Sequence, residues 1–247
     1  MKNIIVIPAT TLNVQVDPMQ EVSEGICLLD LVHKQAVLTR ADTIVVTSES
    51  RVVGRYCKEK AYNFFPSSEK CRSGTHRCAE VAYRFNPAAK VGNVVCWPVT
   101  EPSLLPQDVD RMIAEHTDEV ISTMTRPVPI ASIPEFVKDP SKVKLRALNK
   151  TQVDFTRCPL PMSQHHIGVY MFSLAGLIHF GAMELTKLSL MEQLEQLTWI
   201  QYGHEYSERP ARFQIHSTTS SWKEHVSVRS LADIKLLKSF LTNEEKV

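Results

Sequence analysis

The sequence predicts an α/β fold with a mixed, mostly parallel sheet and helices on both of its faces. Three short apolar runs carry this prediction, and they occupy residues 4–8, 43–47 and 92–96. Continuous runs rich in Val and Ile are typical of parallel strands that are buried on both sides. Residues 27–38 lie between the first two runs and have the apolar spacing of a helix. Strands and helices that alternate in this way indicate a doubly wound sheet.

The remaining elements follow from the same two periodicities. Helical patterns occupy residues 51–60, 78–84, 107–116, 174–180, 190–200 and 230–241. Strand patterns occupy residues 120–124, 143–148, 166–172 and 213–216. Ser230 is expected to cap the last helix, with Asp233 at its N3 position. Since no repeat or low-complexity linker divides the chain, residues 1–247 are treated as one domain with a β-rich subregion over residues 120–206.

Composition excludes several classes of protein. Lys and Arg number 28 against 27 Asp and Glu, so the net charge of +1 offers no overall field for nucleic acid or for an anionic membrane. The apolar run at residues 4–7 is too short for a signal sequence or a membrane span. The 6 cysteines form no CxxC pair and the 9 histidines no HExxH motif. We therefore expect a cytoplasmic protein with core thiols and without nucleic-acid or membrane partners.

Four motifs follow one another along the chain. They are Ser73-Gly74-Thr75-His76-Arg77, Thr156-Arg157-Cys158-Pro159, His166-Ile167-Gly168-Val169-Tyr170 and Leu194-Glu195-Gln196-Leu197. In order and approximate spacing they resemble the CMP-Kdo synthetases, cytidylyltransferases that activate the acidic octulosonate sugar of lipopolysaccharide. The resemblance implies a Rossmann-like nucleotidyltransferase fold with a β-rich dimerisation subregion. It also implies attack of the sugar's anomeric hydroxyl on the α-phosphate of CTP, assisted by magnesium, with pyrophosphate leaving.

The resemblance assigns one group of residues to the nucleotide: Pro8, Ala9, Ser73, Gly74, Thr75 and Arg77. A small hydroxyl and a glycine let the backbone approach a base edge, which suits this assignment. His76 stands where the family has an acidic residue. The alternative interpretation is a Ser-Gly turn that caps the helix predicted over residues 78–84, because serine is a good N-cap whatever the loop binds.

A second group is assigned to the acidic sugar: Arg157, His166, Tyr170, Glu195 and Gln196. A guanidinium suits a sugar carboxylate because it can bind both oxygens. The period of a strand sends His166 and Tyr170 to the same side. Each residue also has a plainer interpretation, namely a surface arginine at a strand end, a structural histidine and an amphipathic helix around Glu195.

The loop after Ala9, where the resemblance places the triphosphate, lacks cationic side chains. The family has arginines, a lysine and a glycine after its Pro-Ala pair, and these surround the phosphates. Here Pro8-Ala9 is followed by residues without Arg, Lys or Gly up to Gly25. Such donors contribute several kcal/mol to a charged transition state, on the order of 3 kcal/mol each. The loop at residues 162–165, which helps cover the sugar in the family, is also short and should leave the pocket open to water.

The metal-binding motifs differ as well. Thr100 stands where the family's Gly-Asp-Glu-Pro motif has its aspartate, and Arg229 replaces the second aspartate. Magnesium prefers hard oxygen ligands that include carboxylates; Glu101 and Asp233 are nearby but displaced in sequence. We therefore assign no catalytic or metal-binding residue and expect no cofactor.

The leading hypothesis is a binding, regulatory or structural pseudoenzyme whose ligand is an acidic sugar or a cytidine nucleotide. The first alternative is a divergent but active cytidylyltransferase that uses magnesium and carboxylates such as Glu101. The second is a metal-free transferase in which Arg157 and Arg229 bind the anion. Tight binding of magnesium together with CTP would distinguish the active cytidylyltransferase from the pseudoenzyme.

The β-rich subregion also generates a prediction about assembly. Apolar residues at 120–124 and 167–172 could supply the surface through which relatives pair, so we expect a homodimer with a two-fold axis. Light scattering at micromolar concentration should give twice the chain mass. A monomer of 28.0 kDa would contradict the prediction.

Overall fold

The computed structural model of the chain describes residues 2–12, 14, 16–89, 91–118, 121–149, 152–205, 211–219 and 226–244. Its main sheet runs from β11 (Phe213–Ser217) through β7 (Ile121–Pro127), β10 (Gln164–Ser173), β6 (Val91–Cys96), β1 (Lys2–Pro8) and β4 (Thr43–Ser48) to β5 (Phe64–Pro66). β10 is antiparallel to both of its neighbours, whereas the other pairs along this path are parallel. β8 (Lys144–Ala147) and β9 (Val153–Thr156) pair with each other beside β10. The predicted mixed, mostly parallel sheet is confirmed.

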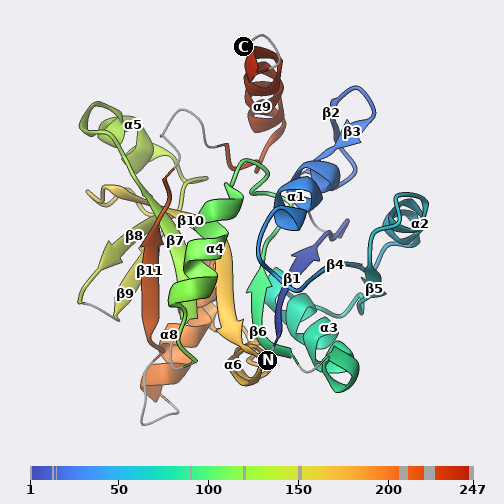
Figure 1. Cartoon of the computed structure of the whole chain (residues 1–247). Helices are drawn as coiled ribbons and strands as arrows, with labels where there is room; N and C mark the ends of the chain where they lie inside the picture. The colour runs from blue at the N-terminus through green and yellow to red at the C-terminus, as the bar shows by residue number, and fades with distance from the viewer. Residues whose placement is uncertain are drawn as a thin grey trace.

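Helices cover both faces of the sheet (Figure 1). One face packs against α1 (Leu28–Val37), α2 (Arg51–Glu59) and α4 (Pro106–Glu115), and the other against α3 (Gly74–Ala89), α6 (Leu174–Gly181) and α8 (Gln196–Glu205). Each face has its own hydrophobic core. Along β1, Ile5 and Ile7 belong to the core beneath α1, α2 and α4, while Ile4 and Val6 belong to the core beneath α3, α6 and α8; all four have 0% exposure. Burial on both faces explains why the strand is apolar throughout rather than alternating.

A third, smaller core lies beneath α9 (Leu231–Glu244), where β2 (Glu21–Ser23) and β3 (Ile26–Cys27) form a short hairpin. Val22, Val228 and Leu237 are buried in it. The predicted cap of α9 is confirmed, because the backbone N–H of Asp233 donates to Ser230 Oγ and the Asp233 carboxylate accepts from the Ser230 hydroxyl. This core and this cap hold the segment that carries Arg229.

The predicted single helix over residues 190–200 is wrong. The structure has α7 (Lys187–Glu192), then a turn, and then α8 from Gln196. Gln193 ends α7 in the left-handed conformation, with φ of 54°, and a helix cannot continue through such a residue. Leu194 and Leu197 are nevertheless buried in the core, at 4% and 5% exposure, so their apolar spacing fits the broken arrangement as well as a continuous helix.

The proline-bearing stretch after β7 contains two elements that the sequence patterns did not predict. They are a 3-10 turn at Ile130–Ser132 and the short helix α5 (Ile133–Lys138). Val120 and Tyr206, the two ends of the predicted β-rich subregion, lie outside the described residues.

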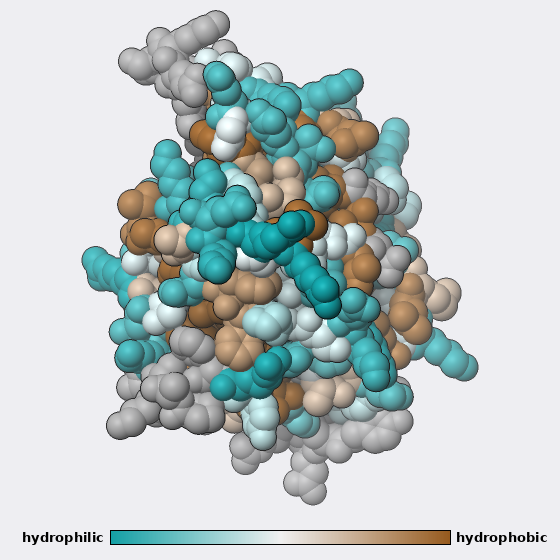
Figure 2. All heavy atoms as spheres, turned by 90° about the vertical axis from the view of Figure 1, so that its right-hand side faces the viewer, coloured by the Kyte–Doolittle hydropathy of each residue, from teal (hydrophilic) through white to brown (hydrophobic). Residues whose placement is uncertain are grey.

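The surface at the β5 edge is mainly hydrophilic. Figure 2 views the side where α2 and β5 lie, and hydrophobic side chains there are scattered among hydrophilic ones. β5 has 3 residues, and such a short edge strand offers little backbone for pairing with another sheet. Within the described part of the chain, no helix combines the length and the apolar character that crossing a bilayer requires.

The left-handed turn makes a prediction about stability. Gln193→Gly should stabilise the protein by about 0.5–1 kcal/mol, because glycine adopts this conformation without a Cβ clash. Met191→Gly is the control, since Met191 lies within α7 and is 82% exposed; it should destabilise by about 1 kcal/mol. Urea unfolding followed by circular dichroism measures both. Equal destabilisation by the two substitutions would contradict the assigned turn.

Candidate functional site

A cavity of about 650 Å³ opens beyond the carboxyl end of β6. Its wall combines Pro98 and Thr100 after β6, the start of α3, the middle of β10, the α7–α8 turn and Arg229 before α9. In open α/β sheets, ligands bind outside the carboxyl ends of the strands. The volume also lies within the roughly 300–1,000 Å³ that is usual for small-molecule sites. This cavity is therefore the candidate binding site.

All of the residues that the sequence assigned to the sugar lie on this wall: Arg157, His166, Tyr170, Glu195 and Gln196. The pleat of β10 turns His166, Gly168 and Tyr170 to the same side of the strand, as predicted. After the break that follows α7, Glu195 and Gln196 line the same cavity. The sequence places Arg229 at a replaced metal ligand and, in the metal-free alternative, beside the anion, and Arg229 does line the cavity. Arg72 and Gln193 also line it, and no sequence pattern predicted them.

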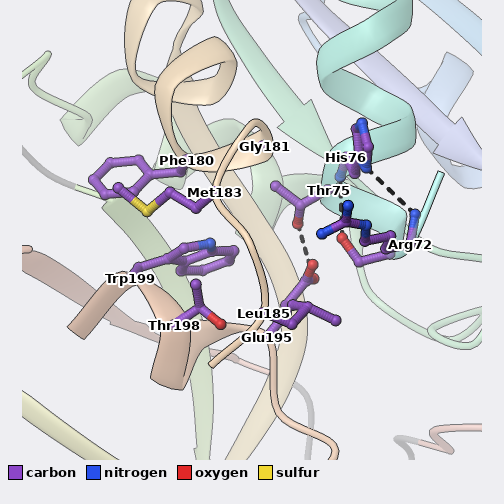
Figure 3. A pocket seen from close by; sticks show the side chains of 11 residues that line it. Arg72, Thr75, His76, Phe180, Gly181, Met183, Leu185, Glu195, Thr198 and Trp199 are labelled. Atoms are coloured by element: carbon purple, nitrogen blue, oxygen red, sulfur yellow. Dashed lines mark hydrogen bonds between the residues drawn. The ribbon is translucent and has the colours of Figure 1, made fainter. Parts of the chain in front are cut away.

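The residues assigned to the nucleotide are more dispersed. Ser73 and Gly74 line the cavity, whereas Pro8, Ala9 and Arg77 are not among the described residues that do so. Thr75 turns toward the α7–α8 segment, where its hydroxyl donates to Glu195 Oε1 at 2.8 Å (Figure 3). Burial raises the pKa of Glu195, and hydrogen bonds from Ser73 and Thr75 oppose that shift. Thr75 and Glu195 thus join α3 to the sugar side of the wall.

Arg77 is held inside the protein. It is 2% exposed, and its Nη2 lies 3.0 Å from Glu49 Oε2, both side chains being 3% exposed. Its Nη1 donates to Ser67 Oγ at 2.6 Å and to the Ser68 carbonyl at 3.2 Å. The guanidinium is therefore used by an internal ion pair and is not among the described side chains that line the cavity.

Glu49 also binds the loop that follows Ala9. Its Oε1 accepts from the Thr11 backbone N–H at 2.7 Å, the Thr11 hydroxyl at 2.9 Å and the Thr10 hydroxyl at 3.2 Å. Burial raises the pKa of Glu49, but the hydrogen bonds from Thr11 and the charge of Arg77 outweigh it, and the net pKa is lowered. The ionised Glu49 carboxylate thus accepts hydrogen bonds from the loop in which the resemblance places the triphosphate. Asn13 and Gln15, farther along this loop, lie outside the described residues.

A second internal ion pair lies at the cavity wall. Arg229 Nη2 donates to Glu101 Oε1 at 3.0 Å, and the side chain of Glu101 is 0% exposed. Glu101 Oε2 accepts from Ser227 Oγ at 2.6 Å, and Oε1 accepts from the Gly168 backbone N–H at 3.4 Å. A Cβ at Gly168 would lie 3.3 Å from Arg229 Nη2 and 3.5 Å from Glu101 Oε1. Glycine at this position leaves the space that the ion pair occupies.

The carboxylates near the expected metal position do not fit a magnesium ion. Both oxygens of Glu101 already accept hydrogen bonds, and one of them faces the Arg229 guanidinium. Asp233 accepts from the Arg229 backbone N–H and from Ser230 at the start of α9. Among the residues that the structure describes, no group of three or more His, Cys, Asp or Glu side chains is placed to hold a metal ion.

The cavity carries a surplus of positive charge. Arg72, Arg157 and Arg229 line it, and burial followed by the charge of Arg229 lowers the pKa of Arg157. Arg157 donates from Nε to the Glu192 carbonyl at 2.9 Å and from Nη1 to the Pro140 and Ser141 carbonyls. Burial and then the Arg229 charge lower the pKa of His166 to about 3, so His166 is neutral at physiological pH. The two guanidiniums therefore supply a charge that does not depend on histidine protonation.

Comparisons with known proteins agree with this fold. The family model for cytidylyltransferases matches residues 23–208. 3-Deoxy-manno-octulosonate cytidylyltransferase of Polynucleobacter necessarius is 32% identical over 196 residues, covering 73% of this chain and 75% of that protein. Enzyme 1 of that name from Hydrogenovibrio crunogenus is 26% identical over 229 residues, covering 83% and 86%.

Solved structures show the same fold. A CMP:2-keto-3-deoxy-manno-octonic acid synthetase complexed with CTP superposes with a TM-score of 0.82 at 18% identity, covering 99% of this chain and 100% of that one. The family match spans well over half of the chain. The chain belongs to the cytidylyltransferase family and is of the CMP-Kdo synthetase type.

Proposed function

We propose that this protein binds an acidic sugar in the cavity but has lost transfer of the cytidylyl group from CTP. The observation that carries the proposal is the contact of Glu49 with Thr10, Thr11 and Arg77. The Glu49 carboxylate accepts the hydrogen bonds that Thr10 and Thr11 could otherwise donate to a phosphate, and it places a negative charge beside the loop. Triphosphate binding needs the opposite, a loop that presents free donors and positive charge.

The charge distribution supports the same proposal. Between Ala9 and Gly25 the chain contains no Arg, Lys or Gly, and Arg77 is paired with Glu49 inside the protein. The cavity, in contrast, retains Arg72, Arg157 and Arg229. Arg157 is one of the residues assigned to the sugar, and Arg229 lines the same cavity. A protein with this distribution is suited to binding a sugar acid rather than to holding a triphosphate for in-line attack.

A divergent, active cytidylyltransferase is the second candidate function. It is favoured by the 32% identity to 3-deoxy-manno-octulosonate cytidylyltransferase of Polynucleobacter necessarius. An active site of that kind would need carboxylates for magnesium, and Glu101 would have to leave Arg229 and Ser227 to provide one. Releasing Glu101 would break the ion pair that compensates the charge of this fully buried carboxylate, and it would also take the carboxylate from the Ser227 hydroxyl. The first proposal requires no such rearrangement.

Turnover is the direct test of the proposed function. With CTP, 3-deoxy-manno-octulosonate and magnesium, we expect no release of pyrophosphate above background, because neither the triphosphate nor the metal has its side chains. The Polynucleobacter necessarius relative serves as the positive control in the same assay. Turnover at about one per second or faster, a typical enzyme rate, would establish the second candidate instead.

A repair experiment separates the lost metal ligands from the occupied loop. Thr100→Asp together with Arg229→Asp should place new carboxylates beside Glu101, and we expect magnesium to bind more tightly than to the parent protein. Activity with CTP and 3-deoxy-manno-octulosonate should remain absent, because Glu49 still holds Thr10, Thr11 and Arg77. Calorimetry measures magnesium binding and pyrophosphate release measures activity. Recovery of synthesis in this variant would show that the loop is dispensable.

A further inference from the structure

We infer that Arg229 is a built-in cation that binds the anionic group of the cavity's ligand and makes a metal ion unnecessary for that binding. The inference rests on the proposed function only in treating the cavity as a ligand site. The ligand is a hydroxylated molecule that presents an anionic oxygen, from a carboxylate or a phosphate, to Arg229. The carboxylate of a sugar acid and the phosphate of a nucleoside monophosphate are its two possible sources.

The position of Arg229 is strongly constrained. The residue before it, Val228, is buried in the third core with 0% exposure, and the Arg229 backbone N–H donates to Asp233 at the start of α9. Its guanidinium donates to Glu101, whose other oxygen is held by Ser227. A binding group that is held in place before the ligand arrives loses less conformational entropy on binding.

Arg229 retains donors for a ligand. Its side chain is 32% exposed and lines the cavity. Nη2 donates to Glu101, and within the described part of the chain neither Nε nor Nη1 makes a hydrogen bond. Glu101 is fully buried behind it and is not among the described residues on the cavity wall. The guanidinium thus has one side fixed by the protein and N–H groups left for an anion, which it can bind in a bidentate manner.

The neighbouring groups favour a negative ligand. Arg157 lines the same cavity, and the charge of Arg229 lowers its pKa, so an anion between the two would relieve their repulsion. Glu195, a carboxyl group on the cavity wall, is half-buried and accepts from Thr75, and burial raises its pKa. His166 and Gln196 are uncharged polar groups on the wall, suited to the hydroxyl groups of a sugar.

Calorimetric titration in buffer containing EDTA tests the inference. The probes are 3-deoxy-manno-octulosonate, its methyl ester, which lacks the negative charge, and CMP. We expect one of the two anions to bind, with the same affinity when magnesium replaces EDTA. The sugar acid binding more tightly than its ester identifies the carboxylate as the source, whereas binding of CMP identifies the phosphate.

The matched variants are Glu101→Gln and the double variant Glu101→Gln with Arg229→Met. Removing Arg229 alone would take the guanidinium away from the buried Glu101 carboxylate, whereas the double variant removes both charges. Loss of a charge-assisted hydrogen bond should weaken anion binding by about 10-fold or more in the double variant, and the loss in Glu101→Gln should be smaller. Arg229→Lys keeps the charge and the partner without the planar fork, and it should give an intermediate loss. Thermal unfolding verifies that each variant is folded.

Several outcomes would overturn the inference. The first is anion binding that requires magnesium, and the second is equal anion affinity of the double variant and Glu101→Gln. The third is equal binding of the sugar acid and its ester without binding of CMP, and the fourth is no binding of either anion. The pyrophosphate assay reports separately on the proposed function. Turnover of CTP by a protein that binds the anion through Arg229 in EDTA would refute the loss of catalysis and leave the role of Arg229 intact.

Discussion

The ion pair between Glu101 and Arg229 joins three parts of the chain at the cavity. Glu101 follows β6, Gly168 lies in the middle of β10, and Arg229 immediately precedes α9. A charge taken fully out of water is tolerated only where a partner and hydrogen bonds compensate it. Arg229, Ser227 and the Gly168 backbone supply that compensation for Glu101. The shape and the charge of the cavity wall therefore depend on this pair.

A second internal pair has the equivalent role on the nucleotide side. Glu49 joins the end of β4 to the loop after β1 through Thr10 and Thr11, and Arg77 joins both to α3. In each place, a charged side chain of the protein occupies the position for which the family resemblance implies a ligand or a metal. Each of these charged side chains has a partner of opposite charge within the protein. The fold superposes on that of a CTP-bound synthetase with a TM-score of 0.82. Retention of a fold with changed site chemistry is common, because function resides in the site.

Local sequence patterns were enough to predict that His166 and Tyr170 point to one side, but they were not enough to predict the contacts of Arg77. His166 and Tyr170 lie on one strand, where a period of two decides the side to which they point. Arg77 carries the side chain that the resemblance assigns to a nucleotide, but its direction depends on Glu49, which lies just after β4 and far from Arg77 in the sequence. Local patterns do not contain that information. The break at Gln193 is a similar case, since apolar spacing at Leu194 and Leu197 is satisfied by one helix or by two.

The sequence alone determined which segments form buried strands and showed that the loop after Ala9 lacks cationic side chains. Apolar runs such as Ile4–Ile7 specify strands that are buried on both faces, and the absence of Arg, Lys and Gly after Ala9 needs no coordinates. The tertiary structure decided what replaces the missing groups. Thr10 meets Glu49 across a sequence separation of 39 residues, and Arg229 meets Glu101 across 128. Such contacts form only when folding brings distant segments together, and burial then makes a partner obligatory for each charge.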